Sequence, residues 1–231
     1  MSPHAEQWPG IRADVLRGAV AIGVTTGAYG LSFGAISTAA GLSVVQTCVL
    51  SLLMFTGASQ YALVSVIGGG GSALSAAGTA ILLGTRNALY GVRLSTLLNV
   101  RGPRRAAAAQ LVIDESTAMA IGQQSDQAGR LGFWATGLAV FVLWNCGTVI
   151  GAFGARALSD PKVLGLDAAA PAAFVALLAP RLDSRQAWAI AVVAASVALV
   201  AVPFVPAGVP ALLVALVALA FGLWPAPTEV P

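Results

Sequence analysis

The sequence predicts an all-α, polytopic integral membrane protein: a helix bundle with about seven or eight transmembrane segments, some broken or re-entrant. Of its 231 residues, 58% are hydrophobic and only 9% are charged, against about 25% charged in an ordinary soluble domain. No Asp, Glu, Lys, Arg or His occurs from Gly18 to Thr85. A chain with so little charge lacks the surface that keeps a protein in water, so the lipid bilayer is its expected solvent.

Length and breaks define the predicted elements, because a spanning helix needs about 20 mostly apolar residues. Breaks at Pro, Gly and charge clusters give candidate helices at residues 16–40, 44–67, 73–98, 106–123, 131–155, 163–180, 186–203 and 209–224. They form a single transmembrane domain, 16–224, between a polar N-terminal tail, 1–15, and a short C-terminal tail, 225–231. The loops are too short to hold a soluble enzyme domain.

Positive charge gathers at the ends of the apolar runs, as expected of membrane helices. The net charge of +3 is therefore interpreted as a topology signal, and we expect no nucleic-acid partner. The arginines at these ends are Arg12, Arg17, Arg101, Arg104, Arg105, Arg130, Arg156, Arg181 and Arg185. With all predicted helices spanning, Lys and Arg divide almost equally between the two sides. This tie leaves the orientation open and suggests that an early segment is re-entrant or broken.

Two glycine series recur at helical spacing, one in the first predicted helix and one in the fifth. They are Gly23, Gly27, Gly30 and Gly34, and then Gly147, Gly151 and Gly154. Spacings of three and four residues place glycines on one helix face, where a neighbouring backbone can approach closely. We predict that these two helices pack together. The same spacing also suits a face that slides or leaves room for a substrate.

A cluster of hydrogen-bonding residues interrupts the charge-free run in the stretch FTGASQYALVSVIGGGG, residues 55–71. Transporters commonly bind substrate at interrupted helices near the membrane midplane. The cluster therefore gives candidate substrate-binding residues, and its alternative role is to join helices or satisfy freed backbone groups. These candidates are Thr56, Gly57, Ser59, Gln60 and Tyr61. The four glycines at 68–71 are predicted to form a turn.

Asp114 and Glu115 lie deep within the fourth apolar run, where a carboxylate usually faces the bundle interior and has a partner. Neighbours on a helix point about 100° apart, so we expect the two carboxylates to occupy different environments. Arg86 and Arg93 are candidate counter-charges, because a spacing of seven puts them on one helix face with Tyr90. The prediction is an interior polar or proton-coupling network. In the alternative, Arg93 snorkels to the interface and Glu115 faces a water-filled vestibule.

Other common chemistries lack their motifs. Cys48 and Cys146 lie inside apolar runs without metal-ligand spacing, and His4, the only histidine, lies in the N-terminal tail. The P-loop pattern that binds ATP phosphates is absent. We therefore expect no metal, no cofactor, no catalytic residue and no enzymatic activity.

Several stretches in order resemble the AzlC family, the large membrane subunit of branched-chain amino acid exporters. They are LRGAVAIGVTTGAYGLSFGAISTAAGLS, MFTGASQYALV, TRNALYGVRLS, VIDESTAMA and GLDAAAPAAFVALLAPRL, which together extend over roughly residues 16–182. The third resembles the family's Asn-Arg segment, and Asn87 and Tyr90 in it join the substrate-binding candidates. Ala88 stands where a histidine is frequent, and Leu31 and Ser32 stand where Pro-Phe is common and a helix break is expected.

The resemblance implies a secondary transporter that exports branched-chain or related neutral amino acids across the bacterial cytoplasmic membrane, coupled to an ion gradient such as that of protons. It also implies a small AzlD-type membrane protein as partner. Three other functions stay open on the residues alone: a passive channel for a small polar solute, a structural membrane subunit, and an intramembrane hydrolase using Asp114 and Glu115. The last is disfavoured because no nucleophile or metal motif accompanies the two acids.

Overall fold

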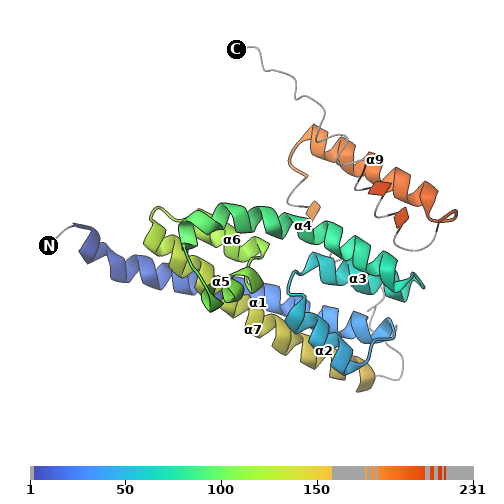
Figure 1. The fold of residues 1–231 in the computed structure, drawn as a ribbon, viewed down its shortest axis with the longest axis horizontal. Helices are drawn as coiled ribbons and strands as arrows, with labels where there is room; N and C mark the ends of the chain where they lie inside the picture. The colour runs from blue at the N-terminus through green and yellow to red at the C-terminus, as the bar shows by residue number, and fades with distance from the viewer. Residues whose placement is uncertain are drawn as a thin grey trace, which may run out of the picture.

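The computed structural model describes residues 3–157 and 182–205, together with residues 175, 178, 179, 209, 210, 213, 214 and 216. Within these residues every regular element is a helix (Figure 1). The helices are α1 (Pro3–Ala39), α2 (Val44–Leu53), α3 (Ala58–Gly68), α4 (Ala73–Leu98), α5 (Pro103–Gln110), α6 (Asp114–Ile121), α7 (Asp126–Ala157) and α9 (Arg185–Ala201).

Two of the described helices, Trp8–Ala39 and Asp126–Ala157, are long and apolar enough to cross a membrane. Three shorter apolar helices accompany them: α2, α3 and α9. The all-helical prediction is confirmed for the described residues, whereas a count of about seven or eight spans is not. The predicted helices 163–180 and 209–224 lie almost entirely outside the described residues.

The long helices α1 and α7 run parallel and form the most extensive helix pair (Figure 1). A Cβ at Gly23 would lie 2.8 Å from the Cβ of Ala139, and one at Gly27 would lie 2.7 Å from the Cβ of Leu143. Real Cβ atoms do not approach this closely, so the two backbones touch only because the side chains are absent. This close contact agrees with the pairing that the glycine spacing predicts.

The same contact continues toward the C-terminal ends of both helices, with one exception. Cβ atoms at Gly30, Gly34, Gly147 and Gly151 would each meet backbone atoms of the opposite helix. Gly154 differs, because nothing lies within 4 Å of a Cβ placed there. The predicted glycine face therefore ends one turn earlier on α7 than its spacing suggests.

The α3 helix runs in the same direction as α1 and ends beside the end of α1. The Tyr61 hydroxyl, in the first turn of α3, donates to the Tyr29 carbonyl of α1 over 2.7 Å. At the other end of α3, a Cβ at Gly68 would lie 3.1 Å from the Cβ of Ala40, which follows α1. α3 thus leads from the middle of α1 back to the end where α2 begins.

The preceding helix, α2, runs the opposite way along α7. Ser51 Oγ and Thr148 Oγ1 lie 3.2 Å apart, and the Phe55 and Phe141 rings pack edge to face with centroids 5.0 Å apart. Residue numbers thus rise on one side of the contact and fall on the other. α2 and α3 therefore form a helical hairpin that enters the bundle, turns at residues 54–57 and returns to its starting end.

A second hairpin, α5 and α6, enters from the other end. A Cβ at Gly137 would lie 3.0 Å from the Cβ of Leu111, and one at Gly132 would lie 2.8 Å from Cγ of Met119. α6 therefore runs antiparallel to α7, from its middle to its beginning. α5 starts at that same end, because the Arg130 guanidinium of α7 donates to the Leu97 carbonyl of α4 over 2.7 Å just before α5 begins.

The two hairpin tips meet in the middle of the bundle. Gln110, the last residue of α5, donates its side-chain amide to the Leu52 carbonyl near the end of α2, over 2.8 Å. Each hairpin is followed by a long helix, α4 or α7, and these two helices run in opposite directions. Two units of hairpin plus long helix are therefore inverted relative to each other, a repeat arrangement common in secondary transporters.

The hairpins correct two predicted spans. Residues 44–67 and 106–123 each form two helices instead of one spanning helix, with breaks at 54–57 and 111–113. The cause at the first break is Gly57, whose φ of +64° ends a helix and favours glycine. α1 also differs from its prediction, since it begins at Pro3 instead of near residue 16 and stays helical through Leu31 and Ser32.

The predicted turn at 68–71 is present, because α3 ends at Gly68, Gly70 has a φ of +78° and α4 begins at Ala73.

We predict that Gly34→Ala destabilises the protein, because the new methyl group meets the Thr148 carbonyl and lies 2.7 Å from the Ala152 nitrogen. Overpacking of this kind costs about 1–3 kcal/mol. Gly154→Ala is the matched control, with open space around it, and should be neutral or slightly stabilising because Ala favours helix. Thermal unfolding of both variants in detergent measures the difference. Equal melting temperatures would show that the glycine face is not a packing requirement.

Candidate functional site

A cavity of about 310 Å³ lies where the two hairpin tips meet. Its walls come from the first tip, the second tip, the middle turns of α1, α4 and α7, and Leu178. The lining residues are Thr26, Tyr29, Phe55, Thr56, Gly57, Ala58, Tyr61, Leu83, Arg86, Ile113, Asp114, Glu115, Val140, Trp144 and Leu178. Both helix breaks and both carboxylates therefore border one cavity.

The first tip is held in shape by Gln60. Its side-chain oxygen accepts from the Gly57 N–H over 3.1 Å, and its amide nitrogen donates to the Leu50 carbonyl over 3.4 Å. One side chain thus joins the end of α2 to the start of α3. A break in the helix frees backbone groups that an apolar interior cannot hydrate, and fully buried Gln60 satisfies one of them, the Gly57 N–H. Its second bond adds to the Leu50 carbonyl, which also accepts from the Met54 N–H.

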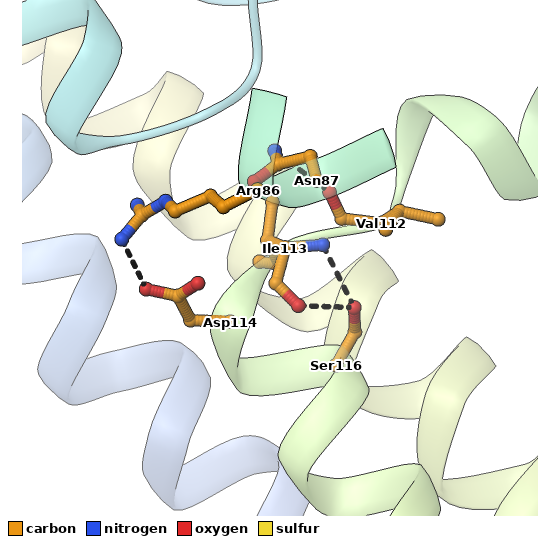
Figure 2. Close-up of polar contacts among 6 residues, drawn as sticks. All are labelled: Arg86, Asn87, Val112, Ile113, Asp114 and Ser116. Atoms are coloured by element: carbon orange, nitrogen blue, oxygen red, sulfur yellow. Dashed lines mark hydrogen bonds and ion pairs between the residues drawn. The ribbon is translucent and has the colours of Figure 1, made fainter. Parts of the chain in front are cut away.

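The second tip is held by Ser116 and Asn87 (Figure 2). Ser116 Oγ accepts from the Ile113 N–H over 3.2 Å and donates to the Leu111 carbonyl over 2.6 Å. The Asn87 amide, on α4, donates to the Val112 carbonyl over 3.1 Å. As at the first tip, short polar side chains replace the helical hydrogen bonds that the break removes.

An ion pair crosses the cavity wall beside this tip. Arg86 Nη1 on α4 lies 2.9 Å from Asp114 Oδ2 at the start of α6, and Figure 2 shows the arginine reaching along the tip to the carboxylate. The two side chains are 31% and 28% exposed, so both remain accessible from the cavity. Glu115 lines the same cavity, and no ion pair with it occurs among the described residues.

Both carboxylates line one cavity, which corrects the expectation that they occupy different environments. The prediction treated them as neighbours in the middle of a spanning helix, where side chains 100° apart face different surroundings. Here they form the first turn of α6. The end of this helix faces the cavity, so side chains on different sides of the first turn still border the same space.

The remaining wall is apolar and aromatic. Trp144 stacks on Phe33 with ring centroids 5.9 Å apart, and Tyr61 packs edge-on against both rings. The Tyr61 hydroxyl is already engaged by Tyr29 and by Ser32 Oγ, which lies 2.7 Å away. This cluster holds the first tip against α1 and α7, and the cavity presents charge on one side and hydrocarbon on the other.

Several predicted site residues lie away from the cavity. Ser59 is fully buried, and its hydroxyl faces Gly84 of α4 without a hydrogen-bond partner among the described residues. Gln60 and Asn87 hold the tips, and Tyr90 packs partly buried against the core. Arg93 is exposed and borders a separate surface pocket with Asp126, which corrects its predicted place in the Asp114 network. Thr56, Gly57, Tyr61, Arg86, Asp114 and Glu115 do line the cavity.

Four other lining residues were missed by the sequence prediction. Thr26 and Tyr29 lie on the cavity side of the glycine-rich helix, and Val140 and Trp144 lie on its partner. Residues of these types are common in membrane helices, so nothing in the local pattern marks them. The one available hint is that Trp144 precedes the second glycine series by one turn, which places it on the α1-facing side of α7.

The fold and the cavity define a class: a helical membrane protein with inverted hairpins around a cavity that combines charged groups with an apolar wall. The sequence model of the family described as AzlC protein matches residues 21–158, and the chain belongs to the AzlC family, membrane proteins associated with transport. An "Uncharacterized membrane protein" of Archaeoglobus fulgidus is 32% identical over 157 residues, covering 67% of this chain and 68% of the relative. No solved structure matches the chain.

We predict that Gln60→Leu destabilises the protein, because it leaves the Gly57 N–H without a hydrogen-bond partner among the described residues, whereas the Leu50 carbonyl keeps its bond from the Met54 N–H. A buried backbone group that loses its hydrogen bond costs about 1–3 kcal/mol. Ser59→Ala is the neighbouring control and should be nearly neutral, since its hydroxyl has no partner among the described residues. Thermal unfolding in detergent compares the two. If Gln60→Leu melts like the wild type, Gln60 does not hold the tip.

Proposed function

We propose that this protein is a secondary transporter that exports a branched-chain or related neutral amino acid. The observation that carries the proposal is the cavity between the two opposed hairpin tips, which combines an ion pair, a further carboxylate and an apolar wall. Substrate sites at the midplane between discontinuous helices are characteristic of secondary transporters. Membership of the AzlC family, which is associated with transport, supports the same function.

The chemistry of a neutral amino acid matches the cavity. Its ammonium needs an acceptor, which Asp114 or Glu115 supplies, and its carboxylate needs donors such as Arg86 or free helix N–H groups. Its branched side chain needs an apolar wall, which Phe55 and Val140 provide. The two acids are also the groups that would carry a proton if export is coupled to the proton gradient.

The proposed setting is the bacterial cytoplasmic membrane, with a small AzlD-type membrane protein as partner. We assign no catalytic residue and no cofactor. Export against a gradient requires energy from outside the chain, and coupling to an ion gradient supplies it. A passive channel differs in one respect, because its flux persists after the gradient is collapsed.

The proposal is tested by loading cells or vesicles with labelled leucine, isoleucine, valine, methionine and a charged amino acid. Efflux is compared with and without the chain, alone and with the candidate small partner, before and after a protonophore. We expect faster efflux of neutral amino acids that stops when the proton gradient collapses. No difference for any neutral amino acid would rule out the proposal, and flux that survives the protonophore would point to a channel.

We further predict that Asp114→Asn and Arg86→Gln each lower efflux by roughly tenfold or more, since a charge-assisted hydrogen bond is worth about 1.5–3 kcal/mol. Each leaves its partner charge uncompensated. Arg93→Gln should leave efflux unchanged, because Arg93 is exposed and borders another pocket. Efflux is normalised to the amount of protein in the membrane. A larger loss for Arg93→Gln than for Arg86→Gln would contradict the structural assignment.

A further inference from the structure

We infer that the cavity binds its zwitterionic substrate in one orientation, with the carboxylate at the start of α3 and the ammonium at the start of α6. We also infer that Trp144 donates its indole N–H to that carboxylate. The inference rests on the proposed function and adds to it a direction of binding and a specificity-determining residue. Its basis is a charge asymmetry between the two hairpin tips, together with one unsatisfied donor.

The asymmetry lies in the first turns of the two half-helices that start at the cavity. Both helix N-termini carry partial positive charge from the helix dipole. In α6 this charge is offset by Asp114 and Glu115, of which only Asp114 is paired with a cation, Arg86. The first turn of α3 contains no acidic residue. The α3 terminus is therefore the end of the cavity that still favours an anion, and the α6 terminus is the end that favours a cation.

Trp144 supplies the second observation. It lines the cavity and is only 3% exposed, yet its indole nitrogen is buried and has no hydrogen-bond partner among the described residues. Its ring packs edge-on against Tyr61, in the first turn of α3, with centroids 6.1 Å apart. The unsatisfied donor therefore belongs to a ring packed against the first turn of α3.

The position of the ring is fixed before any substrate binds. Stacking on Phe33 and contact with Tyr61 hold it from two sides, and the backbone of α7 at Trp144 is in contact with Gly30 of α1. A buried donor without a partner is unfavourable, and an acceptor in the cavity would relieve that cost. A carboxylate is the acceptor that both the α3 terminus and the indole N–H favour.

Three ligands with the same branched tail distinguish binding of the carboxylate from binding of the ammonium. Leucine carries both charged groups, 3-methylbutylamine lacks the carboxylate, and 4-methylpentanoate lacks the ammonium. Their affinities for the purified full-length protein in lipid nanodiscs are measured by displacement of labelled leucine. Trp144→Phe removes the N–H and keeps an aromatic ring. Trp134→Phe, earlier on the same helix, α7, and packed on Phe133 outside the cavity lining, is the control.

We expect Trp144→Phe to weaken leucine and 4-methylpentanoate by roughly tenfold, the effect of losing a hydrogen bond to a charged group. The affinity for 3-methylbutylamine should stay within about twofold, since an amine has nothing for the indole to bind. Glu115→Gln should show the reverse selectivity and weaken leucine and the amine only. Trp134→Phe should change none of the three affinities.

A second measurement needs no change at Trp144. The wild-type protein is labelled with ¹⁵N-tryptophan, and the Trp144 indole signal is assigned by replacing Trp8, Trp134, Trp188 and Trp224 in turn. Leucine and 4-methylpentanoate should shift the Trp144 indole proton downfield, and the amine should not. This measurement tests whether the Trp144 indole N–H binds the carboxylate even if Trp144→Phe does not fold.

The outcomes separate the two levels of the proposal. Leucine that binds the wild type, but equally well to Trp144→Phe and without an indole shift, overturns the role of Trp144 and leaves the proposed function intact. Equal weakening of all three ligands also overturns it, because the ring would then act only by packing. A wild-type protein that binds no neutral amino acid overturns both.

Discussion

The hydrogen-bonding demand of the two hairpin tips is the constraint on which the rest of the structure depends. A helix that turns back inside an apolar bundle exposes carbonyl and N–H groups that water cannot reach. Here side-chain amides and hydroxyls take the place of water: Gln60 joins both sides of the first tip, Ser116 caps the second, and Gln110 links the two. Polar side chains at these breaks, Gln60 in the charge-free run among them, are thus required by the backbone.

The hairpin tips pack against a rigid support, which is the pair of parallel helices α1 and α7. Their glycine faces allow backbone contact, which leaves little freedom for one helix to rotate against the other. The hydrogen bond from Tyr61 to α1 and the Ser51 contact with α7 then fasten the first hairpin to this pair. The inverted arrangement sets both breaks at the middle of the bundle, where they enclose the cavity.

The same backbone constraint creates the electrostatics of the site. Each hairpin presents the positive N-terminal end of its second helix to the cavity, so two equivalent poles face one space. Asp114 and Glu115 reverse the charge of one pole, and Arg86 compensates part of that reversal. What remains is a cavity with two carboxylates and one arginine at the α6 end, a helix N-terminus without acidic residues at the α3 end, and an aromatic wall. The proposed zwitterionic substrate matches this arrangement.

The sequence by itself determined that the protein is helical and belongs in a lipid bilayer, and it carried the family motifs. It also determined that the two glycine-rich helices pack together. Composition and a spacing of three and four residues are local properties, so they can be read without the fold. The sequence also identified Gly57 and Asp114 as candidate site residues. A glycine beside polar residues weakens a helix, and a carboxylate in an apolar run is unfavourable without a partner. Only the tertiary structure decided that residues 44–67 and 106–123 are hairpins, because an apolar run has the same length and hydropathy whether it crosses or returns. The roles of Gln60, Arg93 and Trp144 depended on that decision, since a side chain's partners are set by which helices meet.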